Sequence, residues 1–262
     1  MDRQTYNQIY NSLWNFEDVF KISEKYSESQ GAIATLLSQK VVTLARKNHR
    51  RIHGKDEELF FRWKKGLSIL ELSQKFRFPP TLMASLILKK AGISKKSINL
   101  LFRNPDMIQN KRLKREVKKA LASDYFFSPR AHALQVRKGD LGEAILQKWL
   151  ETHKIAYLNE AELRKNGDGK TPDFVLQVPL SLEGVKVRWI ESKALFGDEN
   201  EHRHYIKKQF KEYSELFGEG MVVYWYGFLE GLPSETFLIK DSNFFIECPK
   251  EVEKLQNFLV YW

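Results

Sequence analysis

Apolar residues recur at helical spacing in segment 68–92, on both sides of the sequence "RFPP". This spacing predicts two helices that meet at the proline pair, as in a helix-turn-helix unit. Ser68 and Glu71 have the separation of a capping box, which marks the start of the first helix. Thr81 is placed to cap the second helix, and Gly92 to end it.

Segment 16–50 repeats this plan around "YSESQG", which predicts two helix-turn-helix-like units in tandem. The second helix of the 68–92 unit has few Arg, Asn or Gln residues that could address base edges. It offers mainly Leu82, Met83, Leu86 and Leu88. Such a region can hold DNA without reading its sequence, or it can be a helical bundle with no such role.

A further amphipathic helix is predicted over residues 139–153, "GDLGEAILQKWLETH". Its apolar residues span an arc of roughly 180° at ~100° per residue. Glu143 falls at the border of that arc, where its carboxylate can lean toward whatever the helix packs on. A glutamate in such a position is more often simply solvated.

Two strands with an unusual polar pattern follow. Residues 173–178, "DFVLQV", and 185–193, "VKVRWIESK", are predicted to pair as a hairpin around "LEGV". Alternation places Glu191 and Lys193 on the same face as Trp189, so that charges continue an apolar row. Buried charges cost several kcal/mol unless each has a partner or a metal. The end of the second strand is therefore a candidate site.

Hairpin pairing brings Asp173, at the start of one strand, near Glu191, at the end of the other. Together with Glu143 they form the kind of hard oxygen site that suits Mg²⁺ or Mn²⁺. Lys193 would orient or help to deprotonate a water, or stabilise charge that develops on a phosphate. Asp173, Glu191, Lys193 and Glu143 are thus the candidate catalytic residues for metal-assisted phosphodiester hydrolysis.

The next segment predicts a helix over residues 204–218, followed by the apolar strand "MVVYWYGFL". Gln209 and Tyr213 lie four residues apart on one helix face, where an amide and a phenol can meet DNA or the site. An ordinary amphipathic helix is the alternative. His202 and His204 are interpreted as a polar loop at the mouth of the site, because no third zinc ligand appears at regular spacing.

Charge divides the chain into two parts. Residues 1–124 hold 25 Lys or Arg against 12 Asp or Glu, whereas residues 125–262 hold 18 against 21. The net charges, +13 and −3, predict a basic helical domain (1–124) that holds a polyanion and a domain (125–262) that uses carboxylates. An ordinary basic solvated surface is the alternative.

Basic side chains gather in two runs, "RKNHRRIHGK" and "KRLKREVKK". Contacts with backbone phosphates predict sequence-independent DNA affinity that falls with salt. A solvated helix face or a nuclear-targeting patch explains such runs equally well. The residues predicted to contact substrate are Arg46, Arg50, Lys111, Arg112, Lys114 and Arg115, with Gln209 and Tyr213.

The compartment is indicated by what the sequence lacks. Cys248 is the only cysteine, so no internal disulfide can form, and we expect the cytosol or the nucleus. No stretch approaches the ~20 apolar residues of a membrane span, and the first ten residues have no apolar signal-peptide core. We therefore expect neither membrane insertion nor secretion.

The candidate residues resemble the motifs of the PD-(D/E)xK nuclease superfamily. The similar positions are Pro172-Asp173 (its PD element), Glu191-Ser192-Lys193 (ExK), Glu143 (first core helix) and Gln209…Tyr213 (the QxxxY element of RecB-like members). Within it, "KTPDFVLQVP", "WIESKALFGDE" and "VVYWYGF" are similar to the TPD family. The resemblance covers essentially the whole chain and is strongest from 139 to 229.

The resemblance implies an α+β or α/β protein in which an all-helical, helix-turn-helix-like region precedes a restriction-endonuclease-like core, a mixed β-sheet flanked by helices. It implies Mg²⁺ or Mn²⁺ held by Asp173, Glu191 and the main-chain carbonyl of Ser192, and relatedness to archaeal Holliday-junction resolvases. It also implies a nuclear or nucleo-cytoplasmic protein that binds codanin, a regulator of histone supply and chromatin assembly.

We therefore expect a divalent-metal-dependent DNA nuclease with resolvase-like selection of DNA structure and with codanin as a partner. The alternative is a nuclease-fold adaptor that binds DNA and codanin with little or no turnover. A transcriptional regulator is disfavoured by the apolar candidate recognition helix. No feature demands or excludes a dimer. The candidate anchors for codanin are exposed aromatics among Tyr224, Tyr226, Phe244 and Phe245.

Overall fold

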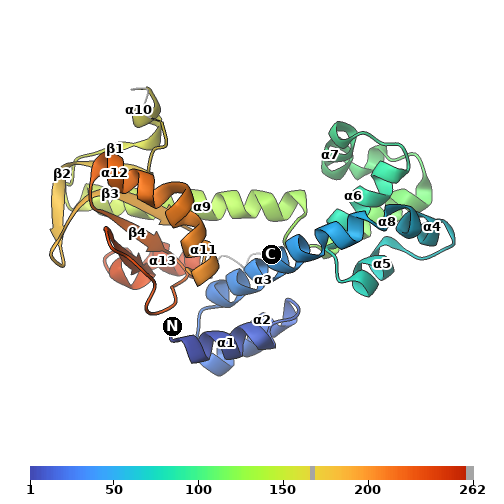
Figure 1. Ribbon diagram of the computed structural model, residues 1–262, viewed down its shortest axis with the longest axis horizontal. Helices are drawn as coiled ribbons and strands as arrows, with labels where there is room; N and C mark the ends of the chain where they lie inside the picture. The colour runs from blue at the N-terminus through green and yellow to red at the C-terminus, as the bar shows by residue number, and fades with distance from the viewer. Residues whose placement is uncertain (166–168, 258–262) are drawn as a thin grey trace. The chain divides into compact units, whose positions relative to one another are not determined.

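The computed structural model describes residues 1–165 and 169–257, which form two compact units (Figure 1). One unit comprises Met1–Leu37 and Arg137–Trp262, and the other comprises Ser38–Val136. This grouping by contacts places the first 37 residues with the sheet and so differs from the predicted boundary at residue 124. It does not test where a functional domain begins, and the two domains stay a prediction.

The unit Ser38–Val136 is built from helices alone. It contains the second part of α3 (Gln30–His53) and the beginning of α9 (Pro129–Thr152). Its other elements are α4 (Asp56–Lys64), α5 (Ile69–Phe76), α6 (Pro80–Lys90), α7 (Lys95–Arg103), the 3-10 turn η1 (Pro105–Met107) and α8 (Lys111–Ser123). In the described ranges, no helix of either unit is long and apolar enough to cross a membrane.

Helices α5 and α6 form the predicted helical pair at 68–92. Ser68 and Glu71 make the capping box in both directions, and Gly92 follows the end of α6 with a φ of +89°. Helix α6 is surrounded by the core of this unit, since Met83 and Leu88 are fully buried. The apolar pattern of α6 is therefore explained by packing inside a helical bundle.

The cap of α6 is different from the prediction. The Asp124 Oδ2 atom accepts a hydrogen bond from the Thr81 N–H at 2.9 Å, so the capping side chain comes from 43 residues further along the chain. The Asp124 Oδ1 atom accepts hydrogen bonds from the N–H groups of Phe126 and Phe127. The prediction that Thr81 caps this helix is wrong, because a distant carboxylate occupies the helix start.

The other unit contains one five-stranded sheet with helices on both faces (Figure 1). Its first helices are α1 (Arg3–Ser12) and α2 (Glu17–Tyr26), followed by the first part of α3. From α9 onward the elements are β1 (Tyr157–Asn159), α10 (Glu160–Lys165), β2 (Phe174–Leu182), β3 (Val185–Lys193), α11 (Glu199–Tyr205), the π turn η2 (Ile206–Phe210), α12 (Lys211–Phe217), β4 (Gly220–Tyr224), β5 (Phe237–Asp241), η3 (Ser242–Phe244) and α13 (Pro249–Gln256).

The sheet has the order β1-β2-β3-β4-β5 and mixes two kinds of pairing. Strands β1, β2 and β3 are antiparallel neighbours, whereas β3, β4 and β5 run parallel. The predicted hairpin is the β2–β3 pair, which turns at Glu183 and Gly184 with positive φ at both residues, the conformation that favours tight hairpins. The predicted mixed sheet with flanking helices is confirmed, as is the helical region that precedes it.

The two faces of the sheet are covered by different helices. On one face, Trp189 and Tyr224 pack with Phe210 and Tyr213 from η2 and α12. On the other face, α9 approaches so closely that a Cβ built on Gly142 would lie 2.5 Å from the Trp225 Nε1 atom. The strand alternation therefore decides which helix each side chain of β3 meets.

Candidate active site

Asp173 and Glu191 meet where β2 and β3 separate. The last paired residues in this direction are Phe174 and Ile190, so β3 continues there without a β2 partner. In the gap, the Ser192 N–H donates a hydrogen bond to the Asp173 Oδ2 atom at 2.7 Å, and the Asp173 N–H donates one to the Glu191 Oε2 atom at 3.2 Å. The hairpin thus brings the two carboxylates together, each hydrogen-bonded to main chain of the opposite strand.

The main-chain carbonyl of Ser192 points toward the same gap. In a β-strand the N–H and the C=O of one residue face the same neighbour, and the Ser192 N–H faces Asp173. The next carbonyl, that of Lys193, faces the other way and accepts a hydrogen bond from the Trp225 N–H at 3.0 Å. Three oxygen groups, from Asp173, Glu191 and Ser192, therefore lie together at the open end of the hairpin, opposite its turn.

Lys193 lies on the same face of β3 as Glu191, as the alternation predicts. Its ammonium group donates a hydrogen bond to the Glu191 carboxylate, whose side chain is 3% exposed. It also lies 4.5 Å from the ring centroid of Tyr205, close enough for a cation–π contact. Glu191 is therefore buried and Lys193 half-buried, and the pair lies on the face of the sheet that α11 and α12 cover.

The electrostatics of this cluster favour an added positive charge. Burial raises the pKa of both Asp173 and Glu191, and the nearby Asp173 carboxylate raises that of Glu191 further. Burial alone would lower the pKa of Lys193, but the carboxylates of Glu191 and Asp173 more than offset this and raise it. One ammonium thus faces two carboxylates, and a divalent cation would relieve their desolvation and repulsion.

Glu143 reaches this region from the opposite face of the sheet. It follows Gly142, whose backbone lies against Trp225 and the Ser192 hydroxyl on the α9 face. Burial, followed by the charges of Asp173 and Asp140, raises the pKa of Glu143 to about 7, although much of its side chain is open to solvent. Glu143 can therefore exchange a proton near neutral pH.

The three predicted carboxylates do not converge on one point. Over residues 1–165 and 169–257, no group of three or more His, Cys, Asp or Glu side chains is arranged to hold a metal ion. The smaller ligand set, with two carboxylates and the Ser192 carbonyl, contains only two such side chains. It fits a hard cation by its chemistry, and Glu143 would join it only through water or a change of rotamer.

Gln209 and Tyr213 are four residues apart across the π turn and α12. The Gln209 Nε2 atom donates a hydrogen bond to the Tyr213 hydroxyl at 3.2 Å, and this hydroxyl donates one to the Thr171 carbonyl at 2.9 Å. Tyr213 is 1% exposed, so it holds the segment before Asp173 from inside the core. Its predicted contact with substrate stays a prediction, and the geometry gives it a positioning role.

The predicted phosphate-contacting residues are in the helical unit and differ in their surroundings. Arg46 and Arg50 are exposed on α3 and line a hollow beside Phe127. Arg112 is used inside the unit, because its guanidinium donates to the Glu116 carboxylate and to the carbonyls of Trp63 and Leu67. The remaining predicted contacts, on α8, are the exposed Lys111 and Arg115 and the half-buried Lys114.

Two further expectations about polar and aromatic residues are wrong, the second of them for three of its four residues. His202 and His204 lie in helix α11, and His202 is fully buried with its ring nitrogens 2.9 Å from the Tyr224 hydroxyl and 2.7 Å from the Pro233 carbonyl. Of the four candidate anchors, Tyr224, Tyr226 and Phe245 are at most 2% exposed and pack in the core, so they cannot anchor a partner, whereas Phe244 is half-buried and stays a candidate.

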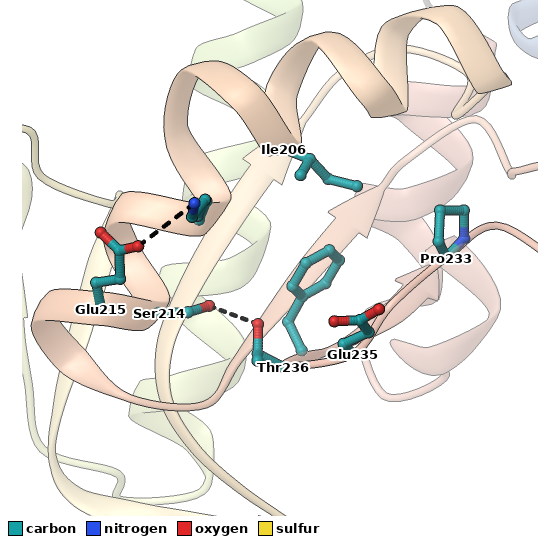
Figure 2. A pocket seen from close by; sticks show the side chains of 8 residues that line it. Ile206, Ser214, Glu215, Pro233, Glu235 and Thr236 are labelled. Atoms are coloured by element: carbon teal, nitrogen blue, oxygen red, sulfur yellow. Dashed lines mark hydrogen bonds and ion pairs between the residues drawn. The ribbon is translucent and has the colours of Figure 1, made fainter.

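A pocket that the sequence pattern did not indicate lies on the α11–α12 side of the sheet, beside the start of β5 (Figure 2). It has a volume of about 530 Å³, with Ile206, Pro233 and Phe237 among its lining residues. Ser214 and Thr236 hydrogen-bond within it at 2.8 Å. None of the residues predicted for the active site lines this pocket.

The fold and this cluster define a mixed α and β protein with a buried glutamate, a half-buried aspartate and a half-buried lysine at the open end of a hairpin. A family model described as "Protein of unknown function TPD sequence-motif" matches residues 109–243. The curated relative from Bos taurus, named "CDAN1-interacting nuclease 1", is 34% identical over 229 residues, which are 81% of this chain and 82% of the relative.

Relatives with the same name show similar agreement. The Homo sapiens protein is 33% identical over 81% of this chain and 82% of its own length, and the Gallus gallus protein is 33% identical over 84% and 85%. The chain therefore belongs to the TPD family of CDAN1-interacting nucleases. No solved structure shows significant similarity to it.

Proposed function

We propose that this protein is a divalent-metal-dependent nuclease that hydrolyses phosphodiester bonds of DNA, with the PD-(D/E)xK type of active site. The observation that carries the proposal is the cluster of Asp173, Glu191 and Lys193 beside the Ser192 carbonyl. Two desolvated carboxylates at one end of a hairpin are costly without a cation, and their oxygens are ligands that Mg²⁺ and Mn²⁺ prefer.

Asp173, Glu191 and the Ser192 carbonyl would hold the cation. When bound, Mg²⁺ or Mn²⁺ supplies Lewis acidity, which polarises a phosphate and lowers the pKa of water. The Lys193 ammonium, fixed on Glu191, stabilises the negative charge that develops on the phosphate or orients the attacking water. Glu143, with a pKa of about 7, accepts or returns a proton at the border of the site.

Tyr213 and Gln209 stabilise this geometry from the side of η2 and α12. By hydrogen-bonding to the Thr171 carbonyl, Tyr213 fixes the segment that leads into Asp173. The Gln209 Oε1 atom is buried and has no hydrogen-bond partner in the described part of the chain, so it is free to accept a bond from a water or from substrate. Tyr213 is therefore a positioning residue in this proposal, and Gln209 holds its hydroxyl.

The names of the relatives also support a nuclease that acts with codanin, and we propose codanin as the protein partner of this chain. A nucleus or nucleo-cytoplasmic location fits the same role. An adaptor without turnover is the second candidate. It is favoured by one observation, that Lys193 and the Ser192 N–H already provide both carboxylates with protein partners.

Cleavage of labelled DNA separates these two candidates. Single-stranded, duplex, flapped and four-way-junction DNA are incubated with the full chain in Mg²⁺, Mn²⁺ or EDTA. We expect metal-dependent cutting that is lost in Glu191→Gln and kept in the exposed-site control Glu253→Gln. Salt-sensitive binding with no cutting of any substrate in either metal would replace the nuclease by the adaptor.

A further inference from the structure

Two hollows in the helical unit adjoin each other beside the start of α6. The first has a volume of about 710 Å³ and is lined from α6, α7 and the beginning of α9. The second, about 500 Å³, is lined mainly from α3. Leu82 and Phe127 line both hollows, so the two hollows are neighbours. Neither hollow shares a residue with the carboxylate cluster.

Thr81 indicates that the first hollow binds a polar group. The residue is 3% exposed and lines this hollow, and its hydroxyl oxygen has no hydrogen-bond partner within the described residues. A buried hydroxyl without a partner is unfavourable, and a ligand could satisfy it. Because the Asp124 carboxylate already caps α6 at this point, an anionic group would be repelled, and a neutral polar edge is better suited to this position.

The other walls of the first hollow suit a flat aromatic ligand. Phe102 and Phe127 are half-buried and offer aromatic surface, and Ser85 and Asn99 add neutral hydrogen-bonding groups. A nucleobase has this combination of a flat π face and a neutral polar edge, and bases stack on such side chains without regard to sequence. The hollow is therefore chemically matched to a base.

The positive charges around the hollows can bind the phosphates next to such a base. Exposed Arg46 and Arg50 line the second hollow, and exposed Arg103 lines the first. None of the described residues that line either hollow is acidic. Cations next to aromatic walls are the usual composition of surfaces that bind single-stranded nucleic acids.

We propose that the two hollows bind unpaired nucleotides of a DNA strand, with a base beside Thr81 and Phe127 and phosphates on Arg46 and Arg50. Bases in an intact duplex are stacked and paired, so they cannot enter such a hollow without being flipped out. If the protein is the nuclease proposed above, its substrate is DNA with a single-stranded part. This assignment of the substrate rests on the proposed function.

Equilibrium binding of the full chain tests this inference without catalysis. A fluorescein-labelled 15-nucleotide single strand and a blunt duplex of the same sequence are each titrated with the protein in EDTA, and fluorescence anisotropy measures binding. We expect Phe127→Ala to weaken single-strand binding about tenfold, the order of one base–aromatic stack, and to leave duplex binding within about twofold. Thr81→Val should weaken single-strand binding about threefold or more without lowering the thermal midpoint, because the hydroxyl it removes has no partner.

Charge is tested with a matched pair of double variants. Arg46→Ala/Arg50→Ala should reduce the salt slope of single-strand binding by about 1.4, or ~0.7 per phosphate contact. Lys95→Ala/Lys96→Ala removes the same charge from exposed residues that line neither hollow and should change affinity at most about twofold. Equal losses for duplex and single strand, or unchanged single-strand affinity in Phe127→Ala and Thr81→Val, would overturn the inference.

Failure of this inference and failure of the proposed function give different results. Selective single-strand binding with no cleavage in Mg²⁺ or Mn²⁺ would refute the nuclease and keep the binding site. Metal-dependent cleavage with no effect of the Phe127 and Thr81 variants on binding would keep the nuclease and refute the site.

Discussion

Replacing Glu191 by Gln should stabilise the metal-free protein at pH 8 while removing a residue proposed for catalysis. Burial and the Asp173 charge raise the pKa of Glu191 to about 8. A carboxyl whose pKa is raised on folding contributes most stability below its unfolded pKa of about 4.3, and this stability is lost as the pH rises through the folded value. Glutamine keeps the shape of the neutral side chain and has no proton to lose.

The magnitude follows from the same linkage. At 1.36 kcal/mol per pKa unit, the rise to about 8 is worth roughly 3–5 kcal/mol of unfolding free energy at pH 8, as an upper bound for a carboxyl that titrates together with Asp173. For a chain of this size that is an upward shift of about 6–20 °C in the thermal midpoint. Near pH 4.5 the variant and the wild-type protein should have similar midpoints.

Thermal unfolding in EDTA between pH 4.5 and pH 8.5, followed by tryptophan fluorescence at constant ionic strength, measures this difference. Trp189 lies in β3 and Trp225 directly follows β4, both next to the site, so they report on its unit. Glu253→Gln makes the same chemical change on an exposed position of α13 and should give a flat difference over the pH range. A Glu191→Gln midpoint equal to or below that of the wild-type protein at pH 8 would mean that Lys193 holds Glu191 in its charged form and that the raised pKa is wrong.

Two further predictions concern the cation and the position of α9. Mn²⁺ should raise the thermal midpoint of the wild-type protein more at pH 8 than at pH 6, because its ligands must be deprotonated. It should leave the thermal midpoint of Glu191→Gln unchanged, and an equal rise in both proteins would place the cation elsewhere. Gly142→Ala should cost about 1–3 kcal/mol, since its Cβ would lie 2.5 Å from the Trp225 Nε1 atom, whereas Gly139→Ala, with nothing within 4 Å, should be neutral or stabilise α9 by up to about 1 kcal/mol. Urea unfolding of both variants measures this difference, and equal effects at the two glycines would refute the close approach of α9.

Local patterns were sufficient for the elements whose partners are close in sequence. The capping box at Ser68 and Glu71 and the β2–β3 hairpin involve residues a few positions apart or joined by one turn. Alternation along β3 then fixes the faces of Glu191 and Lys193, since the period of a strand leaves no other choice. For these parts the fold, and the proximity of Asp173 to Glu191, could be predicted from the sequence.

Contacts between distant segments could not be predicted in this way. Asp124 caps α6 across 43 residues, and no local spacing connects it with Thr81. Tyr213 has the helical spacing of a surface residue, yet it is buried because β3 and β4 lie against α12. The cations of the "KRLKREVKK" run look alike in the sequence, but only the packing of Trp63 against α8 explains why Arg112 is held inside the unit.

Glu143 lies on the predicted face of its helix, but this face alone does not tell which side chains it meets. Its place at the border of an amphipathic helix is as the pattern predicts, but α9 packs on the face of the sheet that carries the Ser192 hydroxyl, opposite Glu191. The negative charge of Asp173 therefore raises the pKa of Glu143. In the described structure, however, Glu143 does not join Asp173 and Glu191 as a third ligand side chain. A group placed there with a pKa of about 7 is better suited to move a proton than to bind a cation permanently. Loss of Glu143 should accordingly change the pH dependence of cleavage more than the affinity for Mn²⁺.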